Sequence, residues 1–491
     1  MEFRSMIEAL EPFIYSSSGP ENDICGIAYD SRAVRPGFAF VAIPGAKADG
    51  HDFIPDAIDR GAAAVICEKE LDLPADVGLV LVKDSRRALA ALSAAYFDHP
   101  DRKLRLIGVT GTNGKTTTAN LIKYLLEKAG RKSGFIGTLG SWDGDEQLSE
   151  LLSASTTPEP LELFRLLDGI VEKGCEYAVM EASSHALDQG RVSSCRFGGA
   201  VFTNLTQDHL DYHKTMEAYA GAKAELFSML DELGYGVVNL DDAYAPDFIR
   251  ACRCRLLTYG ENEKADLRLL QYSASMRGMS FTVFCDGRSY DLRIPLIGRF
   301  NIYNAMAALC AGLAEGLDVE DMAGWLADAP QVPGRFELID EGQDFAVAVD
   351  YAHTPDGLEN VLRAARALKP RRVVTVFGCG GNRDKGKRPL MGRIAGQLSD
   401  VAVLTSDNPR DEDPLQILDM IESGIKQVAN NYLVEENRER AISLALNMAQ
   451  TGDIVVIAGK GHEDYQLIRG ERLHFDDREA ARRVLRARLN K

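Results

Sequence analysis

The sequence contains no apolar run that approaches the roughly 20 residues needed to cross a bilayer. Its first residues, MEFRSMIEALEPF, carry acids among the apolar side chains, so we expect neither a signal peptide nor a membrane anchor. Nine cysteines are scattered through the chain without a single Cys-x-x-Cys pair. An odd, unpatterned set of this kind indicates reduced thiols in a cytoplasm.

Basic residues are fewer than acidic ones: the chain has 56 lysines and arginines against 73 aspartates and glutamates, which gives a formal net charge of −17. Such a surface repels nucleic acid and anionic membranes at long range, so we expect neither as a partner. An anionic ligand must then be held by local positive charge, and the places where Lys and Arg lie among glycines become informative. The chain also lacks visible repeats and low-complexity tracts.

The pattern of strands and helices predicts three α/β blocks, at residues 1–102, 103–332 and 333–491. The first mixes short apolar runs (FAFVAI, AAAVIC, VGLVLV) with polar turns and lacks a glycine-rich phosphate loop. The second opens with the buried strand LRLIGV, and helical patterns separate its later strands. This favours a parallel sheet with a small antiparallel excursion over residues ~256–297. The third alternates strands and helices as a doubly wound sheet does, and such sheets bind ligands beyond the carboxyl ends of their strands.

The sharpest signal is GVTGTNGKTTT at residues 108–118, where a strand runs into a glycine loop and a helix follows. Glycines let backbone N–H groups converge on phosphate oxygens, and the helix N-terminus adds positive potential. Lys115 would then reach the β- and γ-phosphates, and the Thr116 hydroxyl would ligate Mg²⁺. The predicted nucleotide contacts in this loop are Gly111, Thr112, Asn113, Gly114, Lys115, Thr116 and Thr117. A GTPase is not expected, because its base-reading Asn-Lys-x-Asp motif is missing.

Polar residues follow two later buried strands of the same block. Glu181 ends the strand in YAVMEASSHALDQGR, and His209 follows the strand in VFTNLTQDHLDYH. A carboxylate at such a position can hold Mg²⁺ against nucleotide phosphates, although each residue could equally cap a helix or fill a polar loop. That simpler interpretation is favoured for His185 and His213 taken singly. Lys223, in AYAGAKAELF, looks like an ordinary exposed helix lysine.

The succession of GTNGKTT, EASSH and DHLD resembles the Mur ligase family. The resemblance extends through most of the chain in GRFNIYNAMAA (298–308), VPGRFE (332–337) and VDYAHTPDGL (349–358). Mur ligases are cytoplasmic, ATP-dependent amide synthetases of peptidoglycan assembly. The resemblance therefore implies an N-terminal UDP-binding α/β domain, a central P-loop ATPase-like domain built on a parallel sheet, and a C-terminal Rossmann-like domain. We expect a cytoplasmic monomer that uses ATP and Mg²⁺.

The resemblance assigns roles in the central block that the pattern alone does not. Glu181 and His209 match Mg²⁺ ligands of the family. Lys223 matches a lysine that is carbamylated in the family, where it supplies a negative group that helps to position a second Mg²⁺. Lys115, His209 and Lys223 are thus the implied catalytic residues.

Three further nucleotide contacts are implied by the resemblance. Asn304 would meet the adenine, while Arg335 and Asp350 would contact the ATP phosphates and the ribose. From the residues alone, Asn304 could equally cap or pack within its helix, and Arg335 beside Pro333 could be a hinge residue. The sequence does not identify a general base, for which His353 and Asp350 are candidates.

Three loops at strand ends of the third block carry charge: FGCGGNRDKGKRPLMG (377–392), SDNPRDEDP (406–414) and AGKGHEDYQ (458–466). Each alone could be a turn or a solvated basic face. Together they would form one pocket, with arginine forks for a carboxylate and acids for an ammonium. The Asp-Asn-Pro-Arg tetrad is similar to the signature of the Mur ligases that add meso-diaminopimelate, whose distal end carries both groups. The implied amino-acid contacts are Arg383, Asp407, Asn408, Pro409, Arg410, Gly459 and Glu463.

In the first block, YDSRAVRPG and PGAKADG resemble loops that bind the uridine and diphosphate of the precursor, although composition alone would make them ordinary turns. The implied precursor contacts are Tyr29, Ser31, Ala46, Lys47, Ala48, Ser155, Thr156, Thr157, Ser183, Gln189 and Arg191. The implied reaction begins when ATP phosphorylates the D-glutamate γ-carboxylate of UDP-N-acetylmuramoyl-L-alanyl-D-glutamate. The amine of meso-diaminopimelate then attacks the acyl phosphate, after domain closure has brought the two sites together.

Three alternatives stay open on the sequence. A folylpolyglutamate-type or lysine-adding ligase would share the fold and the ATP chemistry, but the Asp-Asn-Pro-Arg tetrad and the first block argue against it. A regulatory protein that senses nucleotide should have lost a reactive residue, whereas the implied catalytic and metal-binding side chains are all present. A motor-type ATPase would need an assembly face and an arginine from a partner, and neither is visible.

Overall fold

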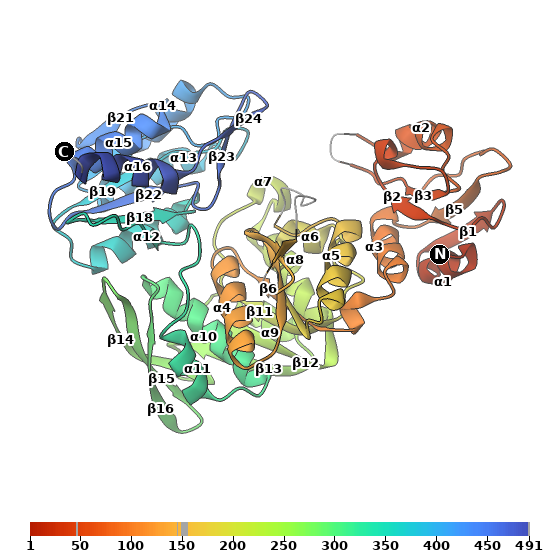
Figure 1. Ribbon diagram of the computed structural model, residues 1–491, viewed down its shortest axis with the longest axis horizontal. Helices are drawn as coiled ribbons and strands as arrows, with labels where there is room; N and C mark the ends of the chain where they lie inside the picture. Colours follow the sequence, from red (N-terminus) through yellow and green to blue (C-terminus); the bar gives the residue numbers. More distant parts are fainter. Residues whose placement is uncertain (46–47, 145, 149–155, 490–491) are drawn as a thin grey trace.

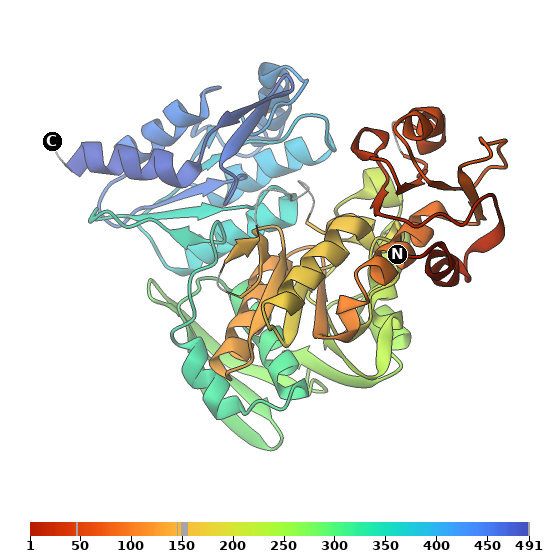
Figure 2. The ribbon, with the colours of Figure 1, turned by 45° about the vertical axis from the view of Figure 1, so that its right-hand side comes forward.

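The computed structural model describes residues 1–45, 48–144, 146–148 and 156–489. Their strands form three α/β sheets that follow one another along the chain, as the sequence predicts, and a separate two-stranded hairpin. The central sheet connects the other two, which lie on either side of it (Figure 1). The view turned by 45° shows the same arrangement (Figure 2). No helix in the described ranges is long and apolar enough to cross a membrane.

The N-terminal sheet has the strand order β1-β5-β4-β3-β2, in which β1 runs antiparallel to β5 and the other pairs are parallel. The three apolar runs of the first block form β3, β4 and β5, as predicted. Helices α1 and α3 cover one face of the sheet, and α2 covers the other. The elements are α1 (Phe3–Leu10), β1 (Ile14–Ser18), β2 (Gly26–Ala28), β3 (Phe38–Val41), α2 (Ile54–Asp59), β4 (Ala64–Cys67), β5 (Gly78–Val82) and α3 (Ser85–Tyr96).

The central sheet has the order β16-β15-β14-β13-β12-β11-β6-β10-β7-β8-β9. Strand β6, which carries the glycine loop, pairs in parallel with β10 and β11, so the carboxyl ends of these strands meet at one edge. The strands are β6 (Arg105–Thr110), β7 (Ser133–Gly137), β8 (Gly140–Trp142), β9 (Gln147–Leu148), β10 (Tyr177–Glu181), β11 (Phe197–Phe202), β12 (Leu230–Asn239), β13 (Arg255–Gly260), β14 (Leu267–Ser275), β15 (Gly278–Cys285) and β16 (Arg288–Ile294). The helices are α4 (Lys115–Lys128), α5 (Pro160–Glu172), α6 (Ser184–Asp188), α7 (Leu210–His213), α8 (Met216–Ser228), α9 (Ala245–Ala251), α10 (Arg299–Ala314) and α11 (Val319–Leu326).

The expected antiparallel excursion is present, but it is shorter than predicted. Strands β14, β15 and β16 pair antiparallel. Strand β13, which the prediction included, instead pairs in parallel with β12 and belongs to the main sheet. Alternation of polar and apolar residues therefore identified the excursion, although it did not give its first residue.

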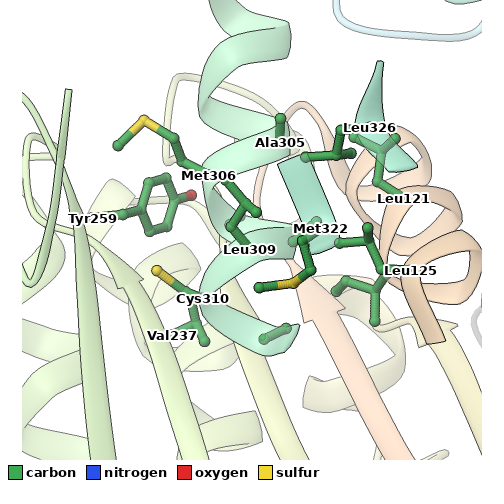
Figure 3. Packing of buried hydrophobic residues seen from close by; sticks show 14 of the residues in the cluster. Leu121, Leu125, Val237, Tyr259, Ala305, Met306, Leu309, Cys310, Met322 and Leu326 are labelled. Atoms are coloured by element: carbon green, nitrogen blue, oxygen red, sulfur yellow. The ribbon is translucent and has the colours of Figure 1, made fainter. Parts of the chain in front are cut away.

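One face of the central sheet is covered by α4, α10 and α11 (Figure 3). Leu121 and Leu125 of α4 belong to the same buried cluster as Met306 of α10 and Met322 of α11. Helix α10 is buried along almost its whole length, as expected of a helix with apolar residues on all sides. Its buried asparagines are exceptions, and one of them, Asn304, lies beside the glycine loop.

The C-terminal sheet has the order β17-β18-β22-β19-β20-β21, in which every pair except β17–β18 is parallel. Helices α12, α13 and α14 cover one face, and α15 and α16 cover the other, so the predicted doubly wound arrangement is confirmed. The strands are β17 (Glu337–Leu338), β18 (Ala346–Asp350), β19 (Val373–Phe377), β20 (Val401–Leu404), β21 (Tyr432–Val434), β22 (Ile454–Ala458), β23 (Tyr465–Ile468) and β24 (Glu471–His474). The helices are α12 (Pro355–Ala367), α13 (Lys387–Leu398), α14 (Pro414–Ile425), α15 (Arg438–Met448) and α16 (Asp477–Leu489).

Candidate active site

The glycine loop joins β6 to α4 in a conformation that requires glycine. Gly111 and Gly114 both have positive φ, +148° and +85°, and a Cβ on Gly111 would lie 1.9 Å from Thr203 Oγ1. The Lys115 ammonium folds back over the loop and donates to the carbonyls of Gly111 (2.9 Å) and Thr112 (2.8 Å). Burial lowers the pKa of Lys115. The loop is thus a preformed turn with a cation held directly over it.

Glu181 meets this loop because β10 and β6 are neighbouring parallel strands. Its buried carboxylate accepts hydrogen bonds from Thr138 N (2.8 Å), Thr138 Oγ1 (3.1 Å) and Thr116 Oγ1 (3.0 Å). Arg335, which follows the central domain, donates from Nη2 to Thr116 Oγ1 at 3.0 Å. Three of the predicted nucleotide and metal residues therefore converge at the start of α4.

Lys223 is not an exposed lysine, so the simple interpretation of its helix position was wrong. Its relative exposure is 1%, and its Nζ donates to Gly111 O at 2.8 Å and lies 4.7 Å from the centre of the Tyr219 ring. Burial lowers the pKa of Lys223 well below the usual value, and the charge of Lys115 lowers it further. The sequence carried a signal for this burial, because Tyr219, Lys223 and Phe227 recur at four-residue spacing on one helical stripe.

His209 lies in a cluster of aromatic rings at the same end of the sheet. Its Nε2 is 3.4 Å from Asp208 Oδ2, and its ring centre is 4.8 Å from that of His185. Partial desolvation and the nearby His185, Lys115 and Lys223 lower the pKa of His209, although its side chain is 44% exposed. The lowered pKa favours the neutral imidazole, which is the form that binds metal ions. Within the described ranges, no group of three or more His, Cys, Asp and Glu side chains converges to hold a metal ion by itself.

Asp350 ends β18 and fixes the segment that enters the C-terminal domain. Its two carboxylate oxygens accept from the backbone N–H groups of Phe336 and Ala352, both at 2.7 Å, and burial raises its pKa to about 6. Arg335 comes directly before Phe336 in the sequence, and its guanidinium lies 4.6 Å from the centre of the Tyr351 ring. His353, the other candidate base, points Nδ1 at Tyr351 O (2.9 Å).

Asn304 lies directly behind the glycine loop. Its Oδ1 accepts from Thr118 Oγ1 at 3.3 Å, and a Cβ on Gly114 would lie 2.3 Å from the same oxygen. Its Nδ2 donates to Asn301 Oδ1 at 3.0 Å. Asn304 thus packs within its helix bundle and also supports the loop, and its predicted contact with adenine stays a prediction.

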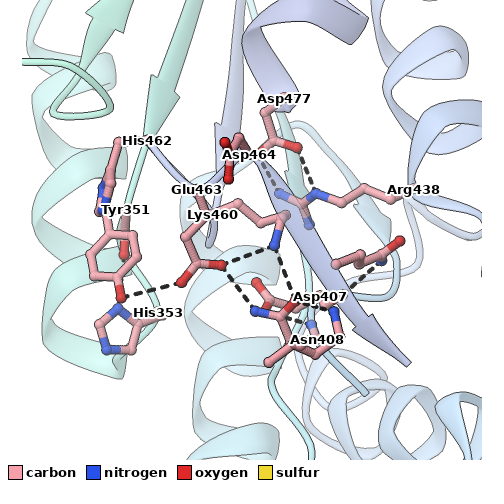
Figure 4. A network of polar contacts seen from close by, with 12 residues as sticks. Tyr351, His353, Asp407, Asn408, Arg438, Lys460, His462, Glu463, Asp464 and Asp477 are labelled. Carbon is pink, nitrogen blue, oxygen red and sulfur yellow. Dashed lines mark hydrogen bonds and ion pairs between the residues drawn. The ribbon is translucent and has the colours of Figure 1, made fainter. Parts of the chain in front are cut away.

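The Asp-Asn-Pro-Arg loop after β20 meets the loop after β22 (Figure 4). Asn408 Nδ2 donates to Glu463 Oε2 at 2.9 Å. Asp407 Oδ2 is buried without a hydrogen-bond partner in the described part of the chain, and a Cβ on Gly459 would lie 2.6 Å from it. Any side chain at position 459 would therefore press against this carboxylate oxygen, which is buried and has an unused capacity to accept a hydrogen bond.

Arg410 and Arg383 lie side by side over the backbone of Gly380. A Cβ on Gly380 would lie 2.9 Å from Arg410 Nη1 and 3.8 Å from Arg383 Cγ. Arg410 is half-buried, and its Nη1 donates to Gly381 O at 2.8 Å, whereas Arg383 is exposed at the rim. Neither arginine forms an ion pair with an acid among the described residues. Burial and the charge of Arg383 lower the pKa of Arg410, while the nearby Asp407 and Glu463 raise it. Two adjacent cations therefore lie close to acidic groups without forming an ion pair with them among the described residues.

Among the described residues that are predicted to bind the UDP end, Tyr29 connects the N-terminal and central domains. Tyr29 OH donates to Glu162 Oε1 at 3.0 Å across this boundary. Arg191 pairs with Glu159 (3.0 Å) and donates to Thr157 O (3.0 Å), and Gln189 accepts from Arg191 Nη2 (2.7 Å). The other described residues of this set interact with nearby protein groups. Ser31 is buried, and Ala48 O accepts from Gly45 N. Thr156 Oγ1 accepts from Thr138 Oγ1, and Ser183 caps α6. Ala46, Lys47 and Ser155 lie outside the described residues.

Three family descriptions match the chain: "Mur ligase family, catalytic domain" over residues 23–97, "Mur ligase middle domain" over 109–312, and "Mur ligase, glutamate ligase domain" over 334–461. The chain belongs to the Mur ligase family. It is therefore an ATP-dependent ligase that forms a peptide-type bond, and the alternatives of a motor ATPase and a nucleotide sensor are set aside.

Individual Mur ligases resemble the chain over nearly its whole length. The UDP-N-acetylmuramoyl-L-alanyl-D-glutamate–2,6-diaminopimelate ligase of Syntrophomonas wolfei is 47% identical over 475 residues, 96% of each chain. Its counterpart in Geobacillus kaustophilus is 47% identical over 97% of this chain and 98% of its own. A solved structure of a ligase with the same name covers 100% of both chains, at 36% identity and a TM-score of 0.70. The MurF ligase of Thermotoga maritima in complex with ADP (20% identity, TM-score 0.65, covering 94% of this chain and 98% of its own) shares the fold.

Sequence reasoning missed one residue of this Mur ligase that joins two domains at the phosphate loop. Asp356, in the first turn of α12, accepts at Oδ2 from Asn113 Nδ2 (2.7 Å) and Thr206 Oγ1 (3.4 Å). A cavity of 180 Å³ lies beside this contact, between the central and C-terminal domains, and Asp208 and Lys387 are among its lining residues. The side chain of Asn113 is therefore oriented by the neighbouring domain of the ligase.

Replacing Asp356 with alanine is expected to raise the KM for ATP about tenfold, corresponding to ~1.4 kcal/mol, because Asn113 loses its charged acceptor. Steady-state kinetics with varied ATP measure the effect. Glu439→Ala is the control, since Glu439 lies on α15, on the face of the C-terminal sheet opposite to α12, and pairs with Arg483 at 3.1 Å. Equal values of KM in both variants would show that the Asp356 contact does not support nucleotide binding.

Proposed function

We propose that this Mur ligase joins meso-diaminopimelate to the D-glutamate γ-carboxylate of UDP-N-acetylmuramoyl-L-alanyl-D-glutamate, with hydrolysis of ATP to ADP and phosphate. The names of the full-length relatives support the substrates. We further propose that it acts in the cytoplasm as a monomer, in peptidoglycan synthesis. Its proposed domains are residues 1–102 for the precursor, 103–332 for ATP and 333–491 for the amino acid.

The observation that carries the choice of amino acid is the pair of adjacent arginines near Asp407, which form no ion pair with an acid among the described residues. Arg410 and Arg383 offer donors for a carboxylate, and the free Asp407 Oδ2 offers an acceptor for an ammonium. Meso-diaminopimelate carries both groups on its distal carbon. Lysine carries only an ammonium at its distal end, so it would leave the half-buried Arg410 without a carboxylate partner.

The chemistry that these residues support is activation of a carboxylate by phosphorylation. The γ-carboxylate attacks the γ-phosphorus of ATP, ADP leaves, and the acyl phosphate then accepts the amine, with loss of phosphate and of the proton on nitrogen. Lys115 and Arg335 lie at the start of α4, where they would offset the negative charge that develops on the transferred phosphoryl group. No serine or cysteine nucleophile is required.

The donors at the glycine loop fit Mg²⁺, the metal ion that the family resemblance implies. Thr116 Oγ1 and Glu181 Oε2 are hard oxygen donors 3.0 Å apart. Magnesium is commonly held by one or two protein oxygens together with substrate phosphates, which matches this sparse set. His209 would hold the ion through its neutral imidazole. When bound, Mg²⁺ would neutralise charge where the carboxylate meets the triphosphate.

We include carbamylation of Lys223 in the proposal. A carbamate forms when a neutral amine adds to CO₂: a nitrogen–carbon bond forms and one proton is released to solvent. The lowered pKa of Lys223 favours the neutral amine that this step needs. The product would place a negative group beside Gly111 O and close to Lys115.

ADP release with UDP-N-acetylmuramoyl-L-alanyl-D-glutamate tests the proposal directly. We expect turnover with meso-diaminopimelate and at least a hundredfold lower kcat/KM with L-lysine, because an unpaired partly buried guanidinium costs about 3 kcal/mol. The other diaminopimelate stereoisomers and D-glutamate complete the panel. Comparable turnover of lysine would establish the lysine-adding alternative, and turnover of a folate with glutamate would establish the folylpolyglutamate-type one.

A further inference from the structure

Lys460 follows Gly459 at the end of β22 and is completely buried, with a side-chain exposure of 0%. Its Nζ donates to Glu463 Oε2 at 2.9 Å and to Asn408 Oδ1 at 3.2 Å (Figure 4). Lysine is almost never fully buried unless its ammonium is paired. The two partners that stabilise the buried ammonium of Lys460 are Glu463 and Asn408, and both belong to the candidate amino-acid pocket.

The contact between Lys460 and Asn408 sets the orientation of the Asn408 amide. Asn408 Oδ1 accepts from Lys460 Nζ and from Leu467 N (3.0 Å), while Asn408 Nδ2 donates to Glu463 Oε2. Turning the amide by 180° would place its NH₂ group against two donors and its oxygen against a carboxylate. Lys460 and Leu467 therefore leave Asn408 only one favourable orientation.

The contact between Lys460 and Glu463 differentiates the two oxygens of Glu463. Oε2 accepts from both Lys460 and Asn408, whereas among the described residues Oε1 has only a long contact with Tyr351 OH at 3.5 Å. Oε1 is thus the oxygen with capacity for another donor. Without the lysine, either oxygen could turn toward a ligand, and the local charge would become more negative by one unit.

The backbone beneath these side chains is fixed separately. Arg438 and Asp477 form a bidentate pair at 2.7 Å, and both side chains have 0% exposure. The Arg438 guanidinium also donates to Ala458 O (3.0 Å) and Ser406 O (3.3 Å), which lie at the ends of β22 and β20. Loss of Lys460 should therefore disturb side-chain orientation more than the course of the two loops.

We propose that Lys460 is a positioning residue for amino-acid selection, which holds Asn408 and one oxygen of Glu463 so that Glu463 Oε1 joins Asp407 Oδ2 in accepting from the distal ammonium of the incoming amino acid. The inference rests on the proposed function, because it concerns the same pocket. It differs in assigning a role to a side chain that does not itself reach the ligand.

The test is steady-state kinetics of Lys460→Met with each of the three substrates varied. We expect the KM for meso-diaminopimelate to rise at least tenfold, while the values of KM for ATP and for the UDP precursor change less than twofold. Lys460→Gln, which keeps one donor, should give an intermediate KM. Lys426→Met is the matched control, because Lys426 pairs with Glu422 at the same 2.9 Å distance in the same domain but is 59% exposed.

A double variant separates positioning from a general loss of stability. If Lys460 acts through Glu463, then Lys460→Met combined with Glu463→Gln raises the KM for diaminopimelate no more than twofold beyond Glu463→Gln alone. If the two substitutions instead raised the KM for diaminopimelate by independent factors that multiply in the double variant, the inference would be overturned. A parallel rise in all three values of KM, or unfolding of both Lys460 variants in a thermal melt, would also overturn it, since either result makes the lysine a purely structural residue.

The wild-type protein in the same experiment distinguishes this inference from the proposed function. Absence of diaminopimelate-dependent ADP release by the wild type would refute the proposed function, and the inference would fall with it. Normal wild-type turnover, with Lys460→Met behaving like Lys426→Met, would refute the inference alone.

Discussion

Lys223→Ala is expected to lower kcat about a thousandfold, the size of effect seen when one preorganised electrostatic group is removed from an active site. The variant loses both the contact with Gly111 O and the nitrogen that would carry the carbamate. We expect formate or acetate at millimolar concentration to restore part of the activity, because a small carboxylate can occupy the space of the missing group. ADP release with and without the added acid is the measurement.

Two companion variants make this result specific. Lys128→Ala should keep full activity, since Lys128 also lies over a tyrosine four residues earlier in its helix, 5.4 Å from the Tyr124 ring centre, but is exposed. Lys223→Arg should be as inactive as Lys223→Ala, because a guanidinium can donate to Gly111 O but cannot form a carbamate. Substantial activity in Lys223→Arg, or no rescue of Lys223→Ala by any short acid, would contradict the carbamate.

Arg410→Met is expected to lower kcat/KM for meso-diaminopimelate by two to three orders of magnitude, about 3–4 kcal/mol, while leaving lysine turnover equal or higher. The variant removes a half-buried donor of the carboxylate site and also removes the penalty for binding lysine. Competition between the two amino acids measures the ratio directly. Arg383→Met should have a smaller effect, because the charge of an exposed arginine is screened by water and salt.

The control for this change is Arg393→Met, an exposed arginine on α13 that bonds to Gln427 Oε1 at 2.7 Å. It should leave both kcat/KM values unaltered. If Arg410→Met still preferred meso-diaminopimelate by the wild-type ratio, the arginine pair would not select the distal carboxylate. The basis of the proposed specificity would then have to lie elsewhere.

The parts of the site that the sequence predicts well are those with a local physical requirement. Gly111 and Gly114 are needed by a tight turn with positive φ, and a strand before and a helix after them are visible within a few residues. The doubly wound C-terminal sheet likewise follows from the repeated alternation of buried strands and amphipathic helices.

Contacts between distant segments could not be predicted from the residues alone. Thr118 and Asn304 are 186 positions apart, and Asn113 and Asp356 are 243 apart, so no local pattern links either pair. Lys223 is an intermediate case, since its four-residue spacing from Tyr219 indicated a buried stripe while its residue type argued for exposure. Arg383 and Arg410 appeared equivalent in the sequence, and only the tertiary structure separates the rim from the interior.

The separation of the recognition loops onto two sheets has a consequence for how new specificities can arise. The glycine loop belongs to the central sheet, whereas residues 407–410 and 459–463 extend from the C-terminal sheet. The domain built on that sheet supplies other residues, Arg335, Asp350 and Asp356, to the nucleotide side. Substitutions in the C-terminal loops can therefore alter the choice of amino acid while the residues that bind ATP stay unchanged. Descendants of a single ancestral scaffold could diversify the building block they attach while inheriting the energetic step unchanged.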